Sequence, residues 1–211
     1  MLSNNQLFKP LVCDLASEDE VYKSMNIIQK EAQSIDALIA CAGILRLGEL
    51  SQMSIKDFDL IFNVNVRGLW LSVSQSMPML KNASKNSGTA RIVLLSSVSA
   101  LRPKINSGAY SASKAAVSQL TRVLAVECAK DNILVNAIAP GTVDTPMVRE
   151  QSSPDKQGNW RPSGPSPLGR ISNPDDIVKV IKFLLDDNSS YVTGTTIPVD
   201  GGTQAAFIPP I

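Results

Sequence analysis

Tyr110 and Lys114 are the two residues whose types and spacing point most directly to chemistry. They stand four residues apart in the stretch SGAYSASKAAVSQLTR, residues 107–122, among many small side chains. Residues four apart on a helix share a face. A free tyrosine has a pKa of about 10, too high for a base at neutral pH, but a nearby ammonium would stabilise the phenolate and lower that pKa. The pair predicts proton transfer; the alternative is an ordinary surface Tyr-Lys pair.

Two further polar residues occur at positions that such chemistry would use. Ser97 ends a predicted buried strand, where its hydroxyl can orient a substrate oxygen. Asn65 falls on the same helical face as the apolar Phe58 and Ile61, where a buried carboxamide needs hydrogen-bond partners. The alternatives are a serine that simply begins a loop and an asparagine that is purely structural.

The composition excludes several other classes of function. In 211 residues, 20 Lys and Arg nearly balance 19 Asp and Glu, which argues against nucleic-acid and membrane-surface partners. The chain has no histidine, which excludes Ser-His-Asp and Cys-His catalysis and a zinc site. No apolar run approaches the ~18 residues of a membrane helix. Three scattered cysteines indicate reduced thiols, so we expect a cytoplasmic protein.

The elements that must position these residues alternate between strands and helices. Helices are expected from a Ser17–Glu20 capping box, from Asn173, and over residues 54–80 and 107–130. Strands are expected at residues 9–17, ending near Asp14, and at 35–43, 91–97, 133–141 and 195–202. Residues 142–171, rich in Pro, Ser and Gly, predict a long mobile ligand-binding loop. This alternation predicts an α/β fold: a single domain, residues 1–211, with a Rossmann-like, doubly wound parallel sheet.

Ligands of such sheets bind at the carboxyl ends of the strands. Those ends carry Asp14, Cys41-Ala42-Gly43, Ser96-Ser97 and Pro140-Gly141. The predicted architecture therefore locates the candidate site before any family is considered.

Taken together, these features resemble the short-chain dehydrogenase/reductase family. Five motifs follow the family's order: NVNVRG with Asn65, IVLLSSVSA with Ser97, YSASK with Tyr110 and Lys114, NAIAPGTVDTPM, and YVTGTTIPVDGG. The matching pieces cover nearly the whole chain. Tyr-x-x-x-Lys alone is a weak signal, whereas five motifs in order are specific.

The resemblance implies an NAD- or NADP-dependent oxidoreductase that interconverts a secondary alcohol and a ketone by hydride transfer. Tyr110 would exchange the proton, and Lys114 would lower the pKa of Tyr110 and hold the nicotinamide ribose. Ser97 would polarise the substrate oxygen, and Asn65 would seat a water that links Lys114 to solvent. The implied cofactor contacts are Tyr110, Lys114, Asp14, Leu15, Cys41, Ala42, Gly43, Pro140, Gly141, Val143 and Thr145.

The resemblance also implies partners and a pocket. Family members form homodimers or homotetramers through the helices that correspond to 54–80 and 107–130, and residues 142–171 would shape the substrate site. AGILRLGEL and DFDLIFNVNVRG are similar to the branch that oxidises cyclic dihydrodiols such as dihydroxy-dihydrobenzoate, and to 3-oxoacyl and sugar reductases.

The chain departs from the family pattern at two places. Cys41 replaces the second residue of the usual Asn-Asn-Ala-Gly, an asparagine that braces the central strands. The family also opens with a strand, a glycine-rich turn and a helix that hold the pyrophosphate, and no such pattern precedes Asp14. We therefore expect the first two strands of the fold to be missing and an unpaired apolar edge beside Leu38.

Two explanations of this truncation remain open. The chain is either a fragment of a longer protein, or a short form in which a strand at Val12 pairs with that at Leu38 or a partner chain fills the gap. Two functions remain open as well. One is an active oxidoreductase, supported by the intact set Asn65, Ser97, Tyr110 and Lys114; the other is a catalytically incompetent form that binds a full-length subunit.

Overall fold

Four parallel strands form the centre of the molecule. The computed structural model describes residues 8–150 and 166–206. In it, β1 (Ala37–Ala40), β2 (Ala90–Leu95), β3 (Ile133–Pro140) and β4 (Thr196–Val199) lie in the order β1-β2-β3-β4. The register pairs Leu38 with Ile92, Ile92 with Val135 and Ile138 with Ile197. The predicted Rossmann-like α/β class is confirmed.

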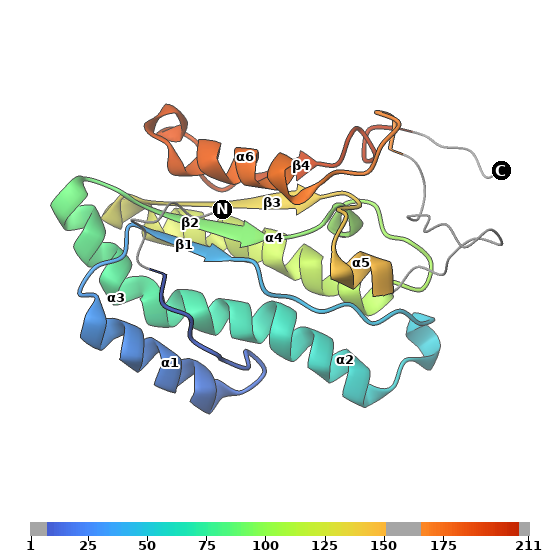
Figure 1. Ribbon diagram of the computed structural model, residues 1–211, viewed down its shortest axis with the longest axis horizontal. Coiled ribbons are helices and arrows are strands. Elements are labelled where there is room, and N and C mark those ends of the chain that lie inside the picture. Colours follow the sequence, from blue (N-terminus) through green and yellow to red (C-terminus); the bar gives the residue numbers. More distant parts are fainter. Residues whose placement is uncertain (1–7, 151–165, 207–211) are drawn as a thin grey trace.

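Helices cover both faces of this sheet (Figure 1). α3 (Leu69–Ser87) and α4 (Gly108–Cys128) pack against one face, and α6 (Pro174–Leu185) packs against the other. α1 (Glu18–Glu31) lies outside this sandwich, against α3. The result is a layer of helices, the sheet, and a second layer of helices, as a parallel sheet requires.

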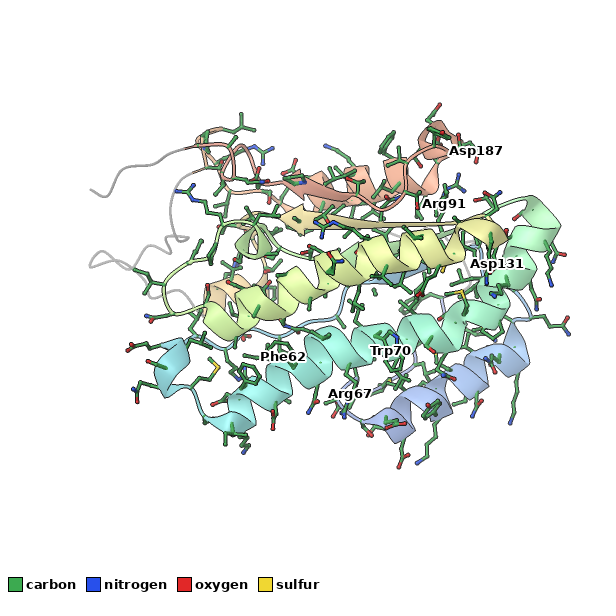
Figure 2. The ribbon with its side chains drawn as sticks, turned by 180° about the vertical axis from the view of Figure 1, so that it is seen from behind. Phe62, Arg67, Trp70, Arg91, Asp131 and Asp187 are labelled. Atoms are coloured by element: carbon green, nitrogen blue, oxygen red, sulfur yellow. The ribbon has the colours of Figure 1, made fainter. Side chains whose placement is uncertain are left out.

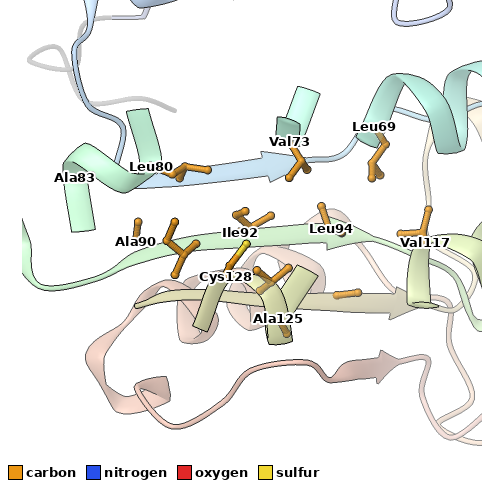
Figure 3. Packing of buried hydrophobic residues seen from close by; sticks show 13 residues of the cluster. Leu69, Val73, Leu80, Ala83, Ala90, Ile92, Leu94, Val117, Ala125 and Cys128 are labelled. Atoms are coloured by element: carbon orange, nitrogen blue, oxygen red, sulfur yellow. The ribbon is translucent and has the colours of Figure 1, made fainter. Parts of the chain in front are cut away.

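The main core lies between the sheet and the α3–α4 layer. Figure 3 shows Leu69, Val73 and Leu80 of α3 above Ile92 and Leu94 of β2. α4 closes the cluster from the other side with Val117, Ala125 and Cys128. Each of the labelled side chains is buried. Burial of this kind contributes about 25 cal/mol per Å2 of apolar surface, so this core fixes α3 and α4 on the sheet.

The long helix expected at 54–80 is interrupted in its middle. It begins as α2 (Ile55–Phe62), capped by the Ser54 hydroxyl, which accepts from the Asp57 amide at 3.1 Å. A π-helical turn, Asn63–Gly68, then leads into α3, which continues to Ser87. Such turns are rare overall, and many of those known lie at functional sites. Nothing in the helical spacing of the sequence predicted this one.

Close packing explains the glycine at the end of that turn. A Cβ on Gly68 would lie 2.3 Å from the Leu15 carbonyl oxygen, so a larger residue would push the N-terminal segment away. Beside it, Arg67 donates to the Ala16 carbonyl at 2.7 Å (Figure 2). These contacts hold the segment that precedes α1 against the π-helical turn.

The strand expected to end near Asp14 is absent. Residues 8–14 form no ladder, and Val12 is 94% exposed. Cys13 and Leu15 pack instead against the cluster formed by α1 and α3. The proposed pairing of Val12 with Leu38 is therefore wrong, because local packing on the helices takes these residues away from the sheet.

β1 is consequently an edge strand in the described part of the chain. It pairs with β2 alone, and Ile39 is 41% exposed. The expected unpaired edge is confirmed, and no strand precedes Ala37 within residues 8–150.

Two smaller expectations need correction. Only half of the Ser17 capping box forms: the Ser17 hydroxyl accepts from the Glu20 amide, but the Glu20 carboxylate accepts from the Asp14 amide. The segment 142–171 contains a short helix, α5 (Pro146–Glu150), and Val143 forms a bridge with Ser172. The rest of that predicted loop, residues 151–165, lies outside the described residues. Within the described ranges, no helix is long and apolar enough to span a bilayer.

The amino end of β2 is tied down far from the ligand edge. Arg91 donates to the Asp187 carboxylate at 2.9 Å and to the Asp186 carbonyl at 3.3 Å (Figure 2).

The expected helices at 107–130 and from Asn173 are confirmed as α4 and α6. α6 carries a complete capping box between Asn173 and Asp176.

Candidate active site

Tyr110 and Ser97 meet at the carboxyl end of β2. Ser97 follows the last residues of that strand and caps the 3-10 turn Val98–Ala100, its hydroxyl accepting from the Ser99 amide at 3.1 Å. Tyr110 lies in the first turn of α4, close enough to Ser97 for that side chain to lower the Tyr110 pKa. Ser97 is buried and Tyr110 half-buried. The predicted proximity of serine and tyrosine is therefore present in the structure.

Lys114 lies one helical turn after Tyr110 and is buried, with 3% of its surface exposed. Its ammonium donates to the Leu95 carbonyl at 2.7 Å and lies 5.9 Å from the centroid of the Tyr110 ring. Burial lowers the pKa of Lys114 to about 8, and the nearby Cys41 thiol acts in the opposite direction. A lysine with this pKa changes its charge near physiological pH.

The expected lowering of the Tyr110 pKa by Lys114 is not found. Burial raises the pKa of Tyr110 above its ordinary value, and the hydrogen bond from Ser97 only partly offsets this. The reason is geometric: the Lys114 ammonium bonds to the Leu95 carbonyl and faces the ring rather than the hydroxyl. In this arrangement Ser97, not Lys114, is the group that favours the phenolate.

Asn65 lies in the π-helical turn and is fully buried. Its carboxamide accepts from the Ile44 amide at 2.8 Å and donates to the Ile44 carbonyl at 3.0 Å. It also donates to the Ser113 hydroxyl at 3.1 Å. The side chain thus fastens the chain after β1 to α4, and the requirement that a buried carboxamide find partners is met.

Gly43 leaves the space in which Lys114 and Asn65 approach the backbone. A Cβ at this position would lie 3.2 Å from the Lys114 nitrogen and 3.3 Å from the Asn65 carbonyl oxygen. These distances are tighter than ordinary van der Waals contact, so a side chain here would displace one of the two polar groups. The glycine is therefore required by Lys114 and Asn65 themselves.

Two serines contribute hydrogen bonds that the sequence did not reveal. Ser113 donates to the Tyr110 carbonyl at 2.7 Å while accepting from Asn65. Ser96 bonds to the Lys114 carbonyl at 2.9 Å and shares a 2.8 Å bond with the Ser118 hydroxyl. The spacing of Ser113 and Ser118 on the inner face of α4 was the available signal, but the sequence indicated only small side chains that permit close approach.

The expected cofactor contacts on the N-terminal side are only partly gathered. Asp14 is exposed, and its carboxylate accepts from the Ala16 amide at 2.9 Å. Leu15 packs on Gly68 rather than facing the sheet edge. Cys41 and Ala42 follow β1 and are exposed, and the Cys41 thiol forms no hydrogen bond with the described residues. The bracing role of the usual asparagine is therefore not taken over by Cys41.

The contacts expected after β3 lie at the same edge of the sheet. Pro140 ends β3, and a Cβ on Gly141 would lie 2.9 Å from the Asp200 Cα, so packing against the end of β4 explains this glycine. Val143 packs against the cluster beneath α6, and the Thr145 hydroxyl donates to the Val143 carbonyl at 3.4 Å.

A nicotinamide dinucleotide has two ends, and the described residues suit them unequally. The nicotinamide ribose needs hydroxyl and ammonium partners beside a backbone that allows close approach, and Tyr110, Lys114 and Gly43 provide these groups. The pyrophosphate needs a helix start without acids, whereas the first turns of α1 and α6 carry acidic side chains. Residues 8–150 and 166–206 therefore fit the nicotinamide half, and they contain no glycine-rich helix start for the phosphates.

A parallel α/β sheet with tyrosine, serine, lysine and asparagine at its carboxyl edge defines a Rossmann-like oxidoreductase (Figure 1). A family model described as enoyl-(acyl carrier protein) reductase matches residues 3–204. The chain belongs to the short-chain dehydrogenase/reductase family, whose members are NAD(P)-dependent oxidoreductases.

Known relatives agree with this assignment. The chain is 36% identical over 193 residues to the 3-oxoacyl-[acyl-carrier-protein] reductase FabG of Thermotoga maritima, covering 92% of this chain and 76% of the relative. It is 34% identical over 203 residues to the 2,3-dihydro-2,3-dihydroxybenzoate dehydrogenase of Escherichia coli, covering 93% and 80%.

Solved structures show the same fold. The ligand-free aldohexose dehydrogenase of Thermoplasma acidophilum has a TM-score of 0.86 at 29% identity, covering 99% of this chain and 83% of that one. The 3-ketoacyl-(acyl-carrier-protein) reductase of Brucella melitensis, complexed with NADH, has a TM-score of 0.79 at 28% identity, covering 91% and 76%.

Proposed function

We propose that this protein interconverts a secondary alcohol and a ketone by hydride transfer with NAD or NADP, and that Tyr110 exchanges the proton. The observation that carries the proposal is the placement of Ser97 and Tyr110: Ser97 follows β2 at the carboxyl edge of the sheet, and Tyr110 lies in the first turn of α4, close enough for Ser97 to lower its pKa. Two adjacent hydroxyls there can both reach one substrate oxygen. Such an arrangement suits proton exchange in a site where the bound cofactor supplies or accepts the hydride.

Ser97 and Tyr110 have different tasks in this proposal. The Ser97 hydroxyl accepts a hydrogen bond from the Ser99 amide, which fixes its position. It would orient the substrate oxygen next to Tyr110, whose pKa Ser97 lowers. Tyr110 gives its proton to a ketone oxygen, or takes one from an alcohol, as the charge on that oxygen changes. Because burial raises the pKa of Tyr110, the phenol is protonated at neutral pH, as a proton donor to a ketone oxygen must be, and it is a weaker acid than a free tyrosine.

Lys114 and Asn65 would support the proton transfer without contacting the substrate oxygen. The buried Lys114 ammonium would hold the nicotinamide ribose together with Tyr110, and Gly43 leaves room for it. Asn65 would seat a water that connects Lys114 to solvent, next to the Ile44 backbone that its carboxamide already holds. The remaining cofactor contacts are proposed at Asp14, Leu15, Cys41, Ala42, Pro140, Gly141, Val143 and Thr145.

The assembly and the substrate site complete the proposal. We propose a single domain over residues 1–211, active in the cytoplasm, with residues 142–171 shaping the substrate site and with no nucleic-acid or membrane partner. Homodimers or homotetramers would form through α2–α3 and α4. Exposed apolar side chains on these helices support this: Trp70 is 46% exposed and Val126 79% exposed (Figure 2).

Thermal unfolding in the presence of NADH and NADPH tests the function. A saturable rise in melting temperature with one of them, weakened in Lys114→Met, is expected because ligand binding to the native state stabilises it. No rise with either cofactor would defeat the enzymatic proposal.

Two observations support a second function. The starts of α1 and α6 carry acidic side chains that disfavour a phosphate, and β1 presents an unpaired edge. A chain that failed to bind either dinucleotide but co-purified with a full-length family member would act as a binding partner, not as an enzyme.

A further inference from the structure

A cavity of about 640 Å3 opens at the carboxyl edge of the sheet. Its walls come from the turn after β2, from Thr142 after β3, from residues 166–172 and from the turn after β4. Val98, which directly follows Ser97, lines it, whereas Tyr110 does not. The volume falls within the ~300–1,000 Å3 of small-molecule sites. Its position at the carboxyl edge makes it the natural extension of the site around Ser97.

The two acidic side chains in the cavity wall are already satisfied. Asp176 forms a bidentate pair with Arg170, at 2.7 and 3.1 Å, and accepts from the Asn173 amide at 3.0 Å. The Asp200 carboxylate accepts from the Gly202 amide at 3.0 Å and from the Gln204 amide at 2.6 Å. Within the described residues, neither carboxylate forms an ion pair with Arg102 or Lys104, which also line the cavity.

The cavity wall also carries Arg102. One terminal nitrogen of its guanidinium donates to the Thr203 carbonyl at 2.6 Å and to the Ala206 carbonyl at 2.9 Å. These bonds fix the half-buried side chain in the cavity wall.

The other two guanidinium nitrogens form no hydrogen bond with the described residues. A guanidinium held at one corner presents its remaining N–H groups in a fork that matches an oxyanion.

Lys104 adds a second cation to the same wall. Burial lowers the pKa of Lys104, and the positive charge of Arg102 lowers it further. Two cations that repel each other gain stability when an anion lies between them. This wall is therefore electrostatically suited to an anionic group.

We propose that this cavity binds the oxyanion of the substrate, a carboxylate or a phosphate, through Arg102 with Lys104 beside it. The substrate would then be an oxo or hydroxy compound whose reacting carbon lies at Ser97 and Tyr110 and whose anionic group lies in the cavity. This inference rests on the proposed function, because it assigns the substrate class of that same site.

Matched pairs of ketones provide the test. Levulinate and acetoacetate are compared with their methyl esters, and dihydroxyacetone phosphate with dihydroxyacetone, by kcat/KM on the full chain. We expect kcat/KM for at least one anion to exceed kcat/KM for its neutral partner, and this preference should weaken as salt is added. The pair that shows the preference distinguishes a carboxylate from a phosphate.

Variants assign the preference to the cavity. Arg102→Gln should reduce kcat/KM for the anion by about tenfold to a hundredfold, because a hydrogen bond to a charged group is lost, while the neutral partner changes little. Arg102→Lys should keep part of the preference, and Lys104→Gln should weaken it less. Lys23→Gln on α1, where the side chain is exposed, is the charge-matched control. A general folding defect would lower kcat/KM for the anionic and the neutral substrate together. The ratio of the two kcat/KM values therefore reports on the cavity alone.

The result that overturns the proposal is an anion preference that is absent in the natural chain or unchanged in Arg102→Gln. If no ketone is turned over with either cofactor, the proposed function fails by itself. Calorimetric titration with levulinate and with dihydroxyacetone phosphate then decides the cavity separately: binding that Arg102→Gln abolishes supports it, and no binding of either probe refutes it.

Discussion

The Lys114 ammonium lies 5.9 Å from the centroid of the Tyr110 ring but donates its 2.7 Å hydrogen bond to the Leu95 carbonyl. The ammonium therefore lies near the Tyr110 ring without shifting the Tyr110 pKa, and Ser97 is the side chain that lowers that pKa. This arrangement separates the group that exchanges the proton from the group that sets the charge beside it. It also makes the four residues testable one at a time.

Tyr110→Phe should lower kcat for ketone reduction by about 100- to 10,000-fold, since a positioned general acid contributes that range. The fold should persist, because the ring remains and only the hydroxyl is lost. Tyr191→Phe, at a fully exposed tyrosine, is the matched control and should keep the natural rate. Equal rates in Tyr110→Phe and in the control would remove Tyr110 from the mechanism.

Lys114 should make stability rise with pH on the alkaline side. Its pKa is about 8 in the folded protein and 10.5 as the ordinary value, so between these values the unfolded chain binds the proton and the native protein does not. The free energy of unfolding should therefore increase as pH rises through this window, by on the order of 3 kcal/mol in total. Below about pH 8 both states are protonated, and this contribution is absent.

Urea denaturation at pH 7.5, 8.5 and 9.5 measures this effect as the difference between the natural chain and Lys114→Met. Staying below pH 10 avoids the ionisation of Tyr110, whose raised pKa would make stability fall at higher pH. Parallel pH dependences in the two proteins would show that the Lys114 pKa is not lowered.

Gly43→Ala should impair activity more than stability. The added Cβ would lie 3.2 Å from the Lys114 nitrogen and 3.3 Å from the Asn65 oxygen, so a shift of a few tenths of an ångström in either group relieves the contact at a cost of about 1 kcal/mol. That shift misplaces Lys114, and we expect about a tenfold loss in kcat/KM. Gly48→Ala is the control, because its nearest neighbour, the Met53 methyl, lies at an ordinary 3.8 Å.

Asn65→Ala should destabilise the protein by about 2–4 kcal/mol, because it removes three hydrogen bonds in a fully buried position. Chemical denaturation is the measurement. Asn82→Ala is the comparison: Asn82 is exposed, and within the described residues its side chain makes a single hydrogen bond, at 3.0 Å to the Gln33 carbonyl, so its loss should cost well under 1 kcal/mol. Similar losses in the two variants would contradict the bracing role of Asn65.

The sequence predicted the strands and helices around the site well because their signals are local. Apolar runs mark β1, β2 and β3, and capping residues such as Ser54 and Asn173 mark helix starts. The expected strand before Asp14 failed because its apolar residues look the same whether they pair in a sheet or pack on helices. In the structure, Leu15 meets Gly68 of a helix instead.

The contacts within the site were harder to predict than its residues. Ser97, Tyr110 and Lys114 were identified by type and spacing, but the direction of the Lys114 ammonium depends on the position of the Leu95 carbonyl, which only the folded sheet fixes. The helical pattern of the sequence also does not mark the π-helical turn that carries Asn65, nor the close packing of Leu15 against its last residue, Gly68. Helical spacing alone contains neither fact.

The most direct test of the central claim is the transfer of deuterium from NADH or NADPH, labelled on the nicotinamide, to a ketone. Cyclopentanone and methyl acetoacetate serve as neutral acceptors, and the product alcohol is analysed by mass spectrometry. We expect deuterium on the carbinol carbon of at least one product with the natural chain, and its loss in Tyr110→Phe. Products without deuterium, or equal incorporation in both proteins, would contradict the claim.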